Sequence, residues 1–210
     1  MIRRCIGLLC MAAAAAGCGR NIPALESGDL LFQAGKGTEM AGAIAAATGA
    51  ARQIDYTHVG IALCANGADS VLEASTEGVR TVALKDFLAE AGSIHGRSAV
   101  VAMRLRDTSG LAASLLRARN CLGLPYDYSF RPDNGRLYCS ELVWESYRRT
   151  DGTPVFPARP MNFRAADGTM PRYWVALFEK LGEPIPEGEP GTNPNEMARD
   201  PQLREVGRWF

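Results

Sequence analysis

A cysteine at position 139 lies where the sequence predicts the first turn of a helix. Turn-forming residues 133–135 precede Cys139, and Leu142, Val143 and Tyr147 follow it at helical spacing. The first turn of a helix has unpaired N–H groups and the positive end of the helix dipole, and both favour the thiolate form of a cysteine. Cys139 is therefore a candidate nucleophile, and the alternative interpretation is a small buried structural residue.

A thiol nucleophile needs a base, and the chain contains only two histidines, His58 and His95. His58 lies in a predicted strand over residues 56–64, and Glu73 lies in the next predicted strand, 70–75. His95 lies in a predicted loop and has no carboxylate in register with it. We therefore expect His58 to serve the thiol and Glu73 to orient the imidazole. The alternatives are a core histidine and a surface carboxylate.

The Asn66-Gly67 pair predicts a two-residue turn between these two strands. Pairing through that turn places Glu73 diagonally across from His58 on the same face of the hairpin, where long side chains are within reach of each other. Gly60 and Ala62 flank His58 on this face and are small enough to leave room for a helix. A hydrogen bond between His58 and Glu73 is therefore feasible.

Two tyrosines, Tyr126 and Tyr128, lie in an aromatic-rich loop before the predicted cysteine helix. A tyrosine hydroxyl close to the thiol can donate a hydrogen bond to an oxyanion or position a substrate, alongside the backbone N–H of Cys139. The alternative is that the two rings only pack under the loop. Both interpretations stay open for Tyr126 and Tyr128.

The composition is that of a globular domain, with 210 residues, 47% hydrophobic residues and a formal net charge of zero. A neutral chain offers no basic face, so we expect no nucleic-acid partner. No CxxC pair or His-rich tract predicts a metal site, and thiol chemistry needs neither a metal nor an organic cofactor. Cys64 and Cys121 can form a disulfide in an oxidising compartment or remain separate buried apolar residues.

Residues 1–17 resemble a bacterial lipoprotein signal peptide, with two arginines near the start, an apolar stretch and small residues before Cys18. Ala15 departs from the large aliphatic residue that is usual at that position, and a plain secretory signal or a cytoplasmic start are the alternatives. Gly19, rather than an aspartate, follows the cysteine and favours the outer membrane. We therefore expect a bacterial cell-envelope protein, lipid-anchored at Cys18 and facing the periplasm.

The rest of the chain divides into a linker over residues 18–27, one catalytic domain over 28–181, and a tail over 182–210. The tail is rich in proline and glycine, and we expect it to be loosely ordered. The predicted strands cover residues 28–33, 56–64, 70–75, 78–82 and 99–105, and the predicted helices cover residues 38–48, 84–91, 109–122, 137–149 and 171–181.

Five segments together resemble the circularly permuted members of the NlpC-type papain-like amidases, the YiiX/YebB-like group. They are residues 28–32, 48–61, 73–79, 125–130 and 138–143. In ordinary papain-like enzymes the cysteine precedes the histidine, so the order of His58 before Cys139 is the mark of the permuted group.

The resemblance implies an α+β fold of the permuted papain-like (NlpC) type, a small antiparallel sheet with the nucleophile helix packed on it. It also implies hydrolysis of amide bonds in cell-wall peptides, most simply those of peptidoglycan, through an acyl-enzyme. Some relatives, such as the lecithin retinol acyltransferase group, transfer acyl groups on lipids instead. A lipid-directed thiol acyltransferase or esterase and a non-catalytic envelope binding protein are therefore the alternatives.

Overall fold

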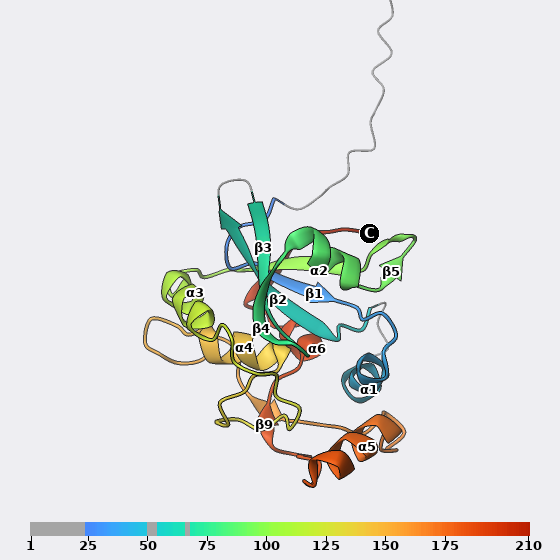
Figure 1. The fold of residues 1–210 in the computed structure, drawn as a ribbon. Helices are drawn as coiled ribbons and strands as arrows, with labels where there is room; N and C mark the ends of the chain where they lie inside the picture. Colours follow the sequence, from blue (N-terminus) through green and yellow to red (C-terminus); the bar gives the residue numbers. More distant parts are fainter. Residues whose placement is uncertain (1–23, 50–53, 66–67) are drawn as a thin grey trace, which may run out of the picture.

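The computed structural model describes residues 24–49, 54–65 and 68–210. The predicted signal peptide, Cys18 and the Asn66-Gly67 turn lie outside the described residues. Among the residues that are described, no helix is both long and apolar enough to cross a membrane. One six-stranded sheet organises this part of the chain, and helices cover both of its faces (Figure 1).

The sheet is antiparallel throughout, with the strand order β10-β7-β1-β2-β3-β4. Its strands are β1 (Leu30–Gln33), β2 (His58–Ala65), β3 (Ala68–Ser75), β4 (Gly78–Ala83), β7 (Val100–Leu105) and β10 (Leu203–Arg208). The central strands β1 and β2 are buried on both faces, which explains their continuous apolar sequences. The five predicted strands are confirmed, and β10 is the strand of this sheet that was not predicted.

The two faces of the sheet carry different helices. Val59 of β2 belongs to the apolar core that also contains the buried residues of α4 (Cys139–Ser146). The opposite face packs against Phe87 of α2 (Leu84–Glu90). Gly60 lies on this second face, where a Cβ atom would come within 2.9 Å of the Phe87 ring. The room predicted on the histidine's face of β2 is therefore filled by α2, whereas the cysteine helix packs on the other face.

The remaining predicted helices are confirmed as α1 (Glu39–Thr48), α3 (Leu111–Asn120) and α5 (Arg172–Leu181). Thr38 caps α1, because its hydroxyl accepts a hydrogen bond from the backbone N–H of Ala41 at 3.1 Å. The cysteine helix ends at Ser146, before the predicted end at residue 149. It ends early because the chain turns back on itself, and the Val155 N–H donates to the carbonyl of Tyr147 at 2.9 Å.

The expectation of a loosely ordered tail over residues 182–210 is wrong. This segment forms β9 (Pro190–Gly191) and α6 (Pro194–Met197) before β10, and it returns across the molecule to the sheet (Figure 1). Strand β9 pairs with β8 (Arg159–Pro160), and β10 covers β7, which would otherwise be an open edge. Buried Leu203 pairs with Leu105 at the start of β10. The prolines and glycines therefore shape the connections of a folded segment.

Candidate active site

Cys139 is the first residue of α4 and is only 4% exposed. The chain before it is held in place, because the Leu137 N–H donates to the carbonyl of Pro125 at 3.1 Å. The buried Glu141 carboxylate accepts a hydrogen bond from the backbone N–H of Tyr138 at 3.3 Å, closing the first turn. The thiol is therefore in the first turn of a helix, as predicted.

His58 is the first residue of β2, and Glu73 lies on β3. The two strands pair with Ala65 opposite Ala68, the register that a two-residue turn predicts. Nε2 of His58 lies 2.7 Å from Oε2 of the buried Glu73 carboxylate. The predicted hydrogen bond between these two side chains is therefore confirmed.

Arg80 on β4 holds the other oxygen of the same carboxylate. It pairs directly across from Glu73 in the sheet, and its Nε donates to Oε1 of Glu73 at 3.0 Å. The guanidinium also lies 3.6 Å from a carboxylate oxygen of Glu90. Our sequence reasoning missed Arg80, although a two-residue turn at Thr76-Glu77 already places it opposite Glu73.

The hydrogen bonds around His58 change its protonation. Burial by itself lowers the pKa of His58, but hydrogen bonds with the thiol of Cys139 and the carboxylate of Glu73 outweigh burial and raise this pKa to about 10. Burial by itself raises the pKa of Glu73, but hydrogen bonds from His58 and Arg80 outweigh burial and lower it. Because Glu73 takes Nε2, Nδ1 is the ring nitrogen left for the thiol. The site therefore favours a charged imidazolium between a thiol and a carboxylate.

A narrow cleft of about 50 Å³ opens beside Cys139, and its walls come from segments far apart in the chain. Most of its lining is apolar or aromatic, and the lining includes Ile44, Ala47, Phe130, Met161, Phe163, Trp174 and, as polar members, Thr192 and Asn193. The indole N–H of Trp174 and the hydroxyl of Thr192 are buried without a hydrogen-bond partner in the described part of the chain. Our sequence reasoning missed these walls, because no local pattern links α1, α5 and residues 192–193.

The two candidate tyrosines occupy different places. Tyr126 lines the cleft with Cys139, and its hydroxyl contacts the sulfur of Met40 at 4.0 Å. Burial, together with the charge of Cys139, raises the pKa of Tyr126 well above its usual value, so the phenol is neutral. Tyr128 packs its ring edge against Tyr126 at 5.0 Å and lines a separate groove between α1 and α5. The structure therefore brings Tyr126, but not Tyr128, to the cleft.

The other predicted candidates lie away from the cleft or outside the described residues. His95 is exposed in the tight turn between β5 (Ser93–Ile94) and β6 (Arg97–Ser98). Cys64 and Cys121 are both free thiols, so the open disulfide question is resolved in favour of separate cysteines. The lipidation candidate Cys18 lies outside the described residues.

Comparisons with known proteins place this geometry in a family. A family model described as permuted papain-like amidase enzyme, YaeF/YiiX, C92 family, matches residues 24–207. The chain belongs to this family. The YiiX protein of Escherichia coli strain K12, which is described as uncharacterized, is 30% identical over 188 residues, covering 87% of this chain and 86% of YiiX.

A solved structure supports the fold. The crystal structure of metalloprotein YiiX from Escherichia coli O157:H7 has a TM-score of 0.69 and 29% identity, and the match covers 87% of this chain and 97% of that one. The C92 membership confirms the permuted papain-like α+β fold and the resemblance inferred from the sequence. Within the residues described for this chain, no group of three or more His, Cys, Asp or Glu side chains is arranged to hold a metal ion.

Proposed function

We propose that this C92-family chain is a thiol hydrolase that cleaves peptide amides through a Cys139–His58–Glu73 triad. One observation carries the proposal: Nε2 of His58 lies 2.7 Å from the buried Glu73 carboxylate, and this carboxylate and the Cys139 thiol together raise the pKa of His58 to about 10. A cysteine that served only packing would not need a charged imidazole beside it. This arrangement supplies the nucleophile, the base and the orienting group of a thiol enzyme.

The proposed reactive state is an ion pair in which the Cys139 proton already resides on His58, so that a thiolate faces the charged imidazolium. The thiolate attacks the carbonyl carbon of the amide, and the free N–H groups at the start of α4, including that of Cys139, stabilise the oxyanion. His58 then protonates the leaving amine, and the C–N bond breaks to give an acyl-enzyme. Water attacks this thioester, releases the acid and restores the thiol. Glu73 keeps the imidazole oriented throughout and stabilises its charged form.

The proposed substrate is a peptidoglycan peptide, reached from the periplasmic face of the outer membrane. The support is the signal-like sequence of residues 1–17, which ends just before Cys18, the proposed site of lipid attachment. Several acyl chains hold a protein firmly, whereas one chain binds only marginally. Intact-mass analysis of protein from its native host tests this anchor, and a mature N-terminus elsewhere without lipid mass contradicts it.

A second candidate function is acyl transfer or ester hydrolysis on lipids. The supporting observation is the apolar lining of the Cys139 cleft, including Ile44, Met161 and Phe163, which suits an aliphatic chain better than a charged peptide. The same triad would then form an acyl-enzyme with a fatty acid.

One experiment separates the two functions. Purified peptidoglycan and phospholipid vesicles are each incubated with the wild-type protein, with Cys139→Ala and with Cys64→Ala, which removes a thiol distant from the triad. We expect new amines from peptidoglycan with the wild type and Cys64→Ala, and none with Cys139→Ala. Release of fatty acid from the phospholipid alone, together with the added mass of a fatty acyl group on Cys139, would contradict the amidase proposal and support the lipid-directed enzyme. No product from either substrate supports a non-catalytic binding protein.

A further inference from the structure

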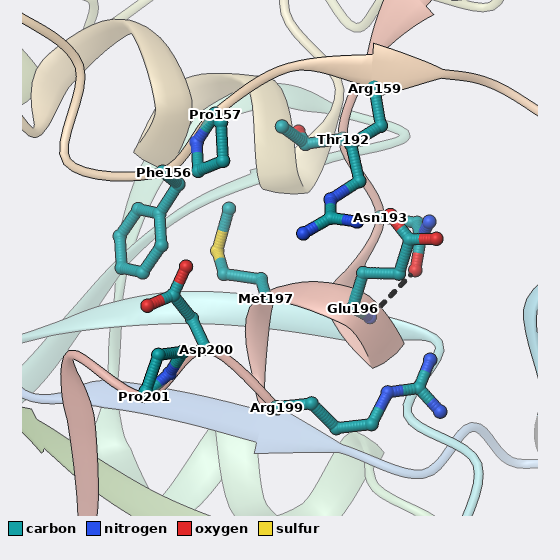
Figure 2. A pocket seen from close by; sticks show the side chains of 10 residues that line it. All are labelled: Phe156, Pro157, Arg159, Thr192, Asn193, Glu196, Met197, Arg199, Asp200 and Pro201. Atoms are coloured by element: carbon teal, nitrogen blue, oxygen red, sulfur yellow. Dashed lines mark hydrogen bonds between the residues drawn. The ribbon is translucent and has the colours of Figure 1, made fainter.

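A second pocket, of about 300 Å³, lies between the 156–159 segment and the segment from Thr192 to Pro201. Figure 2 shows the side chains that line it. Phe156 and Met197 are buried and give the pocket an apolar floor. The pocket is therefore made largely by the C-terminal segment that also completes the sheet.

Thr192 joins this pocket to the Cys139 cleft, because it lines both of them. Its backbone is fixed to the two residues that flank the nucleophile. The Thr192 N–H donates to the hydroxyl of Tyr138 at 3.1 Å, and its carbonyl accepts from the hydroxyl of Ser140 at 3.1 Å. The pocket and the Cys139 cleft are therefore neighbours, with Thr192 as their common wall.

The pocket is lined by two arginines, Arg159 and Arg199, and neither forms an ion pair with a residue that the structure describes. Arg80, Arg104 and Arg131 each form ion pairs with carboxylates. Figure 2 shows the side chain of Arg159 reaching from β8 into the space between Thr192 and Met197.

Two carboxylates line the same pocket. The carboxylate of Glu196 has no hydrogen-bond donor in the described chain, and that of Asp200 accepts only the backbone N–H of Gln202. Two arginines, Arg159 and Arg199, and these two acids therefore line one pocket, and this balance of charges does not favour a ligand that is only anionic, such as phosphate. These side chains suit a ligand that carries one carboxylate and one ammonium group.

We propose that this pocket binds a complete amino-acid head group, with its free carboxylate on Arg159 and its free ammonium on Glu196, whose carboxylate lies on the Arg159 side of Met197 in Figure 2. The inference rests on the proposed function, because Cys139 defines the reacting end. A residue with both groups free is joined to the rest of the substrate through its side chain. The aliphatic side chain would pass over Met197 and Thr192. The scissile bond would then be a side-chain amide, an isopeptide, whose hydrolysis adds OH to the acyl carbon and a proton to the side-chain nitrogen.

The test uses two isomers of one dipeptide, Nε-(L-alanyl)-L-lysine and Nα-(L-alanyl)-L-lysine. They have the same atoms and charges, but only the first keeps the lysine head group free. Binding to Cys139→Ala is measured by NMR titration, so that no hydrolysis intervenes. We expect the Nε isomer to bind about tenfold more tightly than the Nα isomer, the size of one charge-assisted contact.

Further substitutions in the Cys139→Ala protein test whether the dipeptide binds in the pocket of Arg159. Arg159→Gln should weaken binding of the Nε isomer about tenfold and abolish the preference between isomers. Arg119→Gln, which changes an exposed arginine on α3, should leave both affinities unchanged. Equal binding of the two isomers, no saturable binding up to about 10 mM, or full affinity in Arg159→Gln overturns the proposal.

These outcomes are separable from those of the proposed function. If the wild type cleaves no amide but the isomers bind with the stated preference, the hydrolase proposal fails and the pocket stands. If the wild type cleaves amides and Arg159→Gln changes neither binding nor preference, the hydrolase stands and the pocket assignment is wrong.

Discussion

Two regions of this molecule meet at Cys139, and they are built in different ways. The β2–β3–β4 meander carries His58, Glu73 and Arg80 within a short stretch of chain, and neighbouring strands set their distances. The cleft instead combines α1, α5 and the segment around Thr192, and the second pocket combines that segment with residues 156–159, so both join parts of the chain that are far apart in sequence. The comparison shows that the ionised groups behind the thiol are positioned by neighbouring strands of one meander. The walls that would contact a substrate depend instead on the tertiary packing of distant segments.

The largest effect should come from His58 in the β2–β3–β4 meander. His58→Ala removes the partner of the thiol, and we expect kcat/KM for amide hydrolysis to fall by about three orders of magnitude or more. His95→Ala is the matched control and should be nearly silent, because His95 lies exposed in the β5–β6 turn. Steady-state rates decide the assignment, and an inactive His95→Ala beside an active His58→Ala would reverse it.

Glu73→Gln should have the next largest effect, because it keeps a hydrogen-bond acceptor but removes the charge that helps to raise the pKa of His58 to about 10. In the wild type, His58 loses its proton as pH rises through about 10. The acid that protonates the leaving amine is then lost, and activity falls. The stability that the charged ring contributes is complete below its ordinary pKa of about 6.5 and is also lost through pH 10.

In Glu73→Gln the alkaline fall in kcat/KM should therefore move to lower pH by about one unit or more, with a drop of about 10–100-fold at its optimum. The pH–rate profiles of the wild type and the variant give this comparison. An unchanged alkaline limit would show that Glu73 does not control His58.

Arg80→Gln should act more weakly through the same carboxylate. Arg80 does not reach the thiol but fixes Oε1 of Glu73 at 3.0 Å, so it is a positioning residue. We expect a loss of about tenfold in kcat, little change in KM, and a smaller shift of the alkaline limit than in Glu73→Gln. Arg80→Lys should restore part of the rate, and Arg119→Gln provides the surface control. A change confined to thermal stability, with wild-type kinetics, would leave Arg80 a structural role only.

The smallest effect tests the cleft. Tyr126→Phe removes a hydroxyl whose neighbour is the sulfur of Met40, so we expect kcat to change by less than about threefold. The ring itself, which lines the cleft, is kept. A loss of tenfold or more in kcat at unchanged KM would show that this hydroxyl stabilises the oxyanion. One catalytic contact would then come from the walls of the cleft rather than from the β2–β3–β4 meander.

Local patterns in the sequence were sufficient for the meander and for the start of the nucleophile helix. The Asn66-Gly67 pair predicts the register in which Ala65 of β2 lies opposite Ala68 of β3, and the period of two along each strand puts His58 and Glu73 on one face. Turn residues followed by helical spacing placed Cys139 in a first turn. These predictions succeeded because the relevant contacts are close in sequence and depend on strand and helix periodicity.

Only the tertiary structure decided what surrounds the thiol. Strand β10 pairs with β7 about a hundred residues away, and no local period signals such a pairing, so the proline- and glycine-rich segment was misjudged as a loose tail. The same segment carries Thr192 to the nucleophile and forms the pocket of Arg159. The sequence by itself determined the candidate reacting groups. The packing of distant segments against one another decided the shape and charge of the space that a substrate would enter. This packing could not be predicted from the sequence, because a contact between remote elements produces no periodic pattern in either of them.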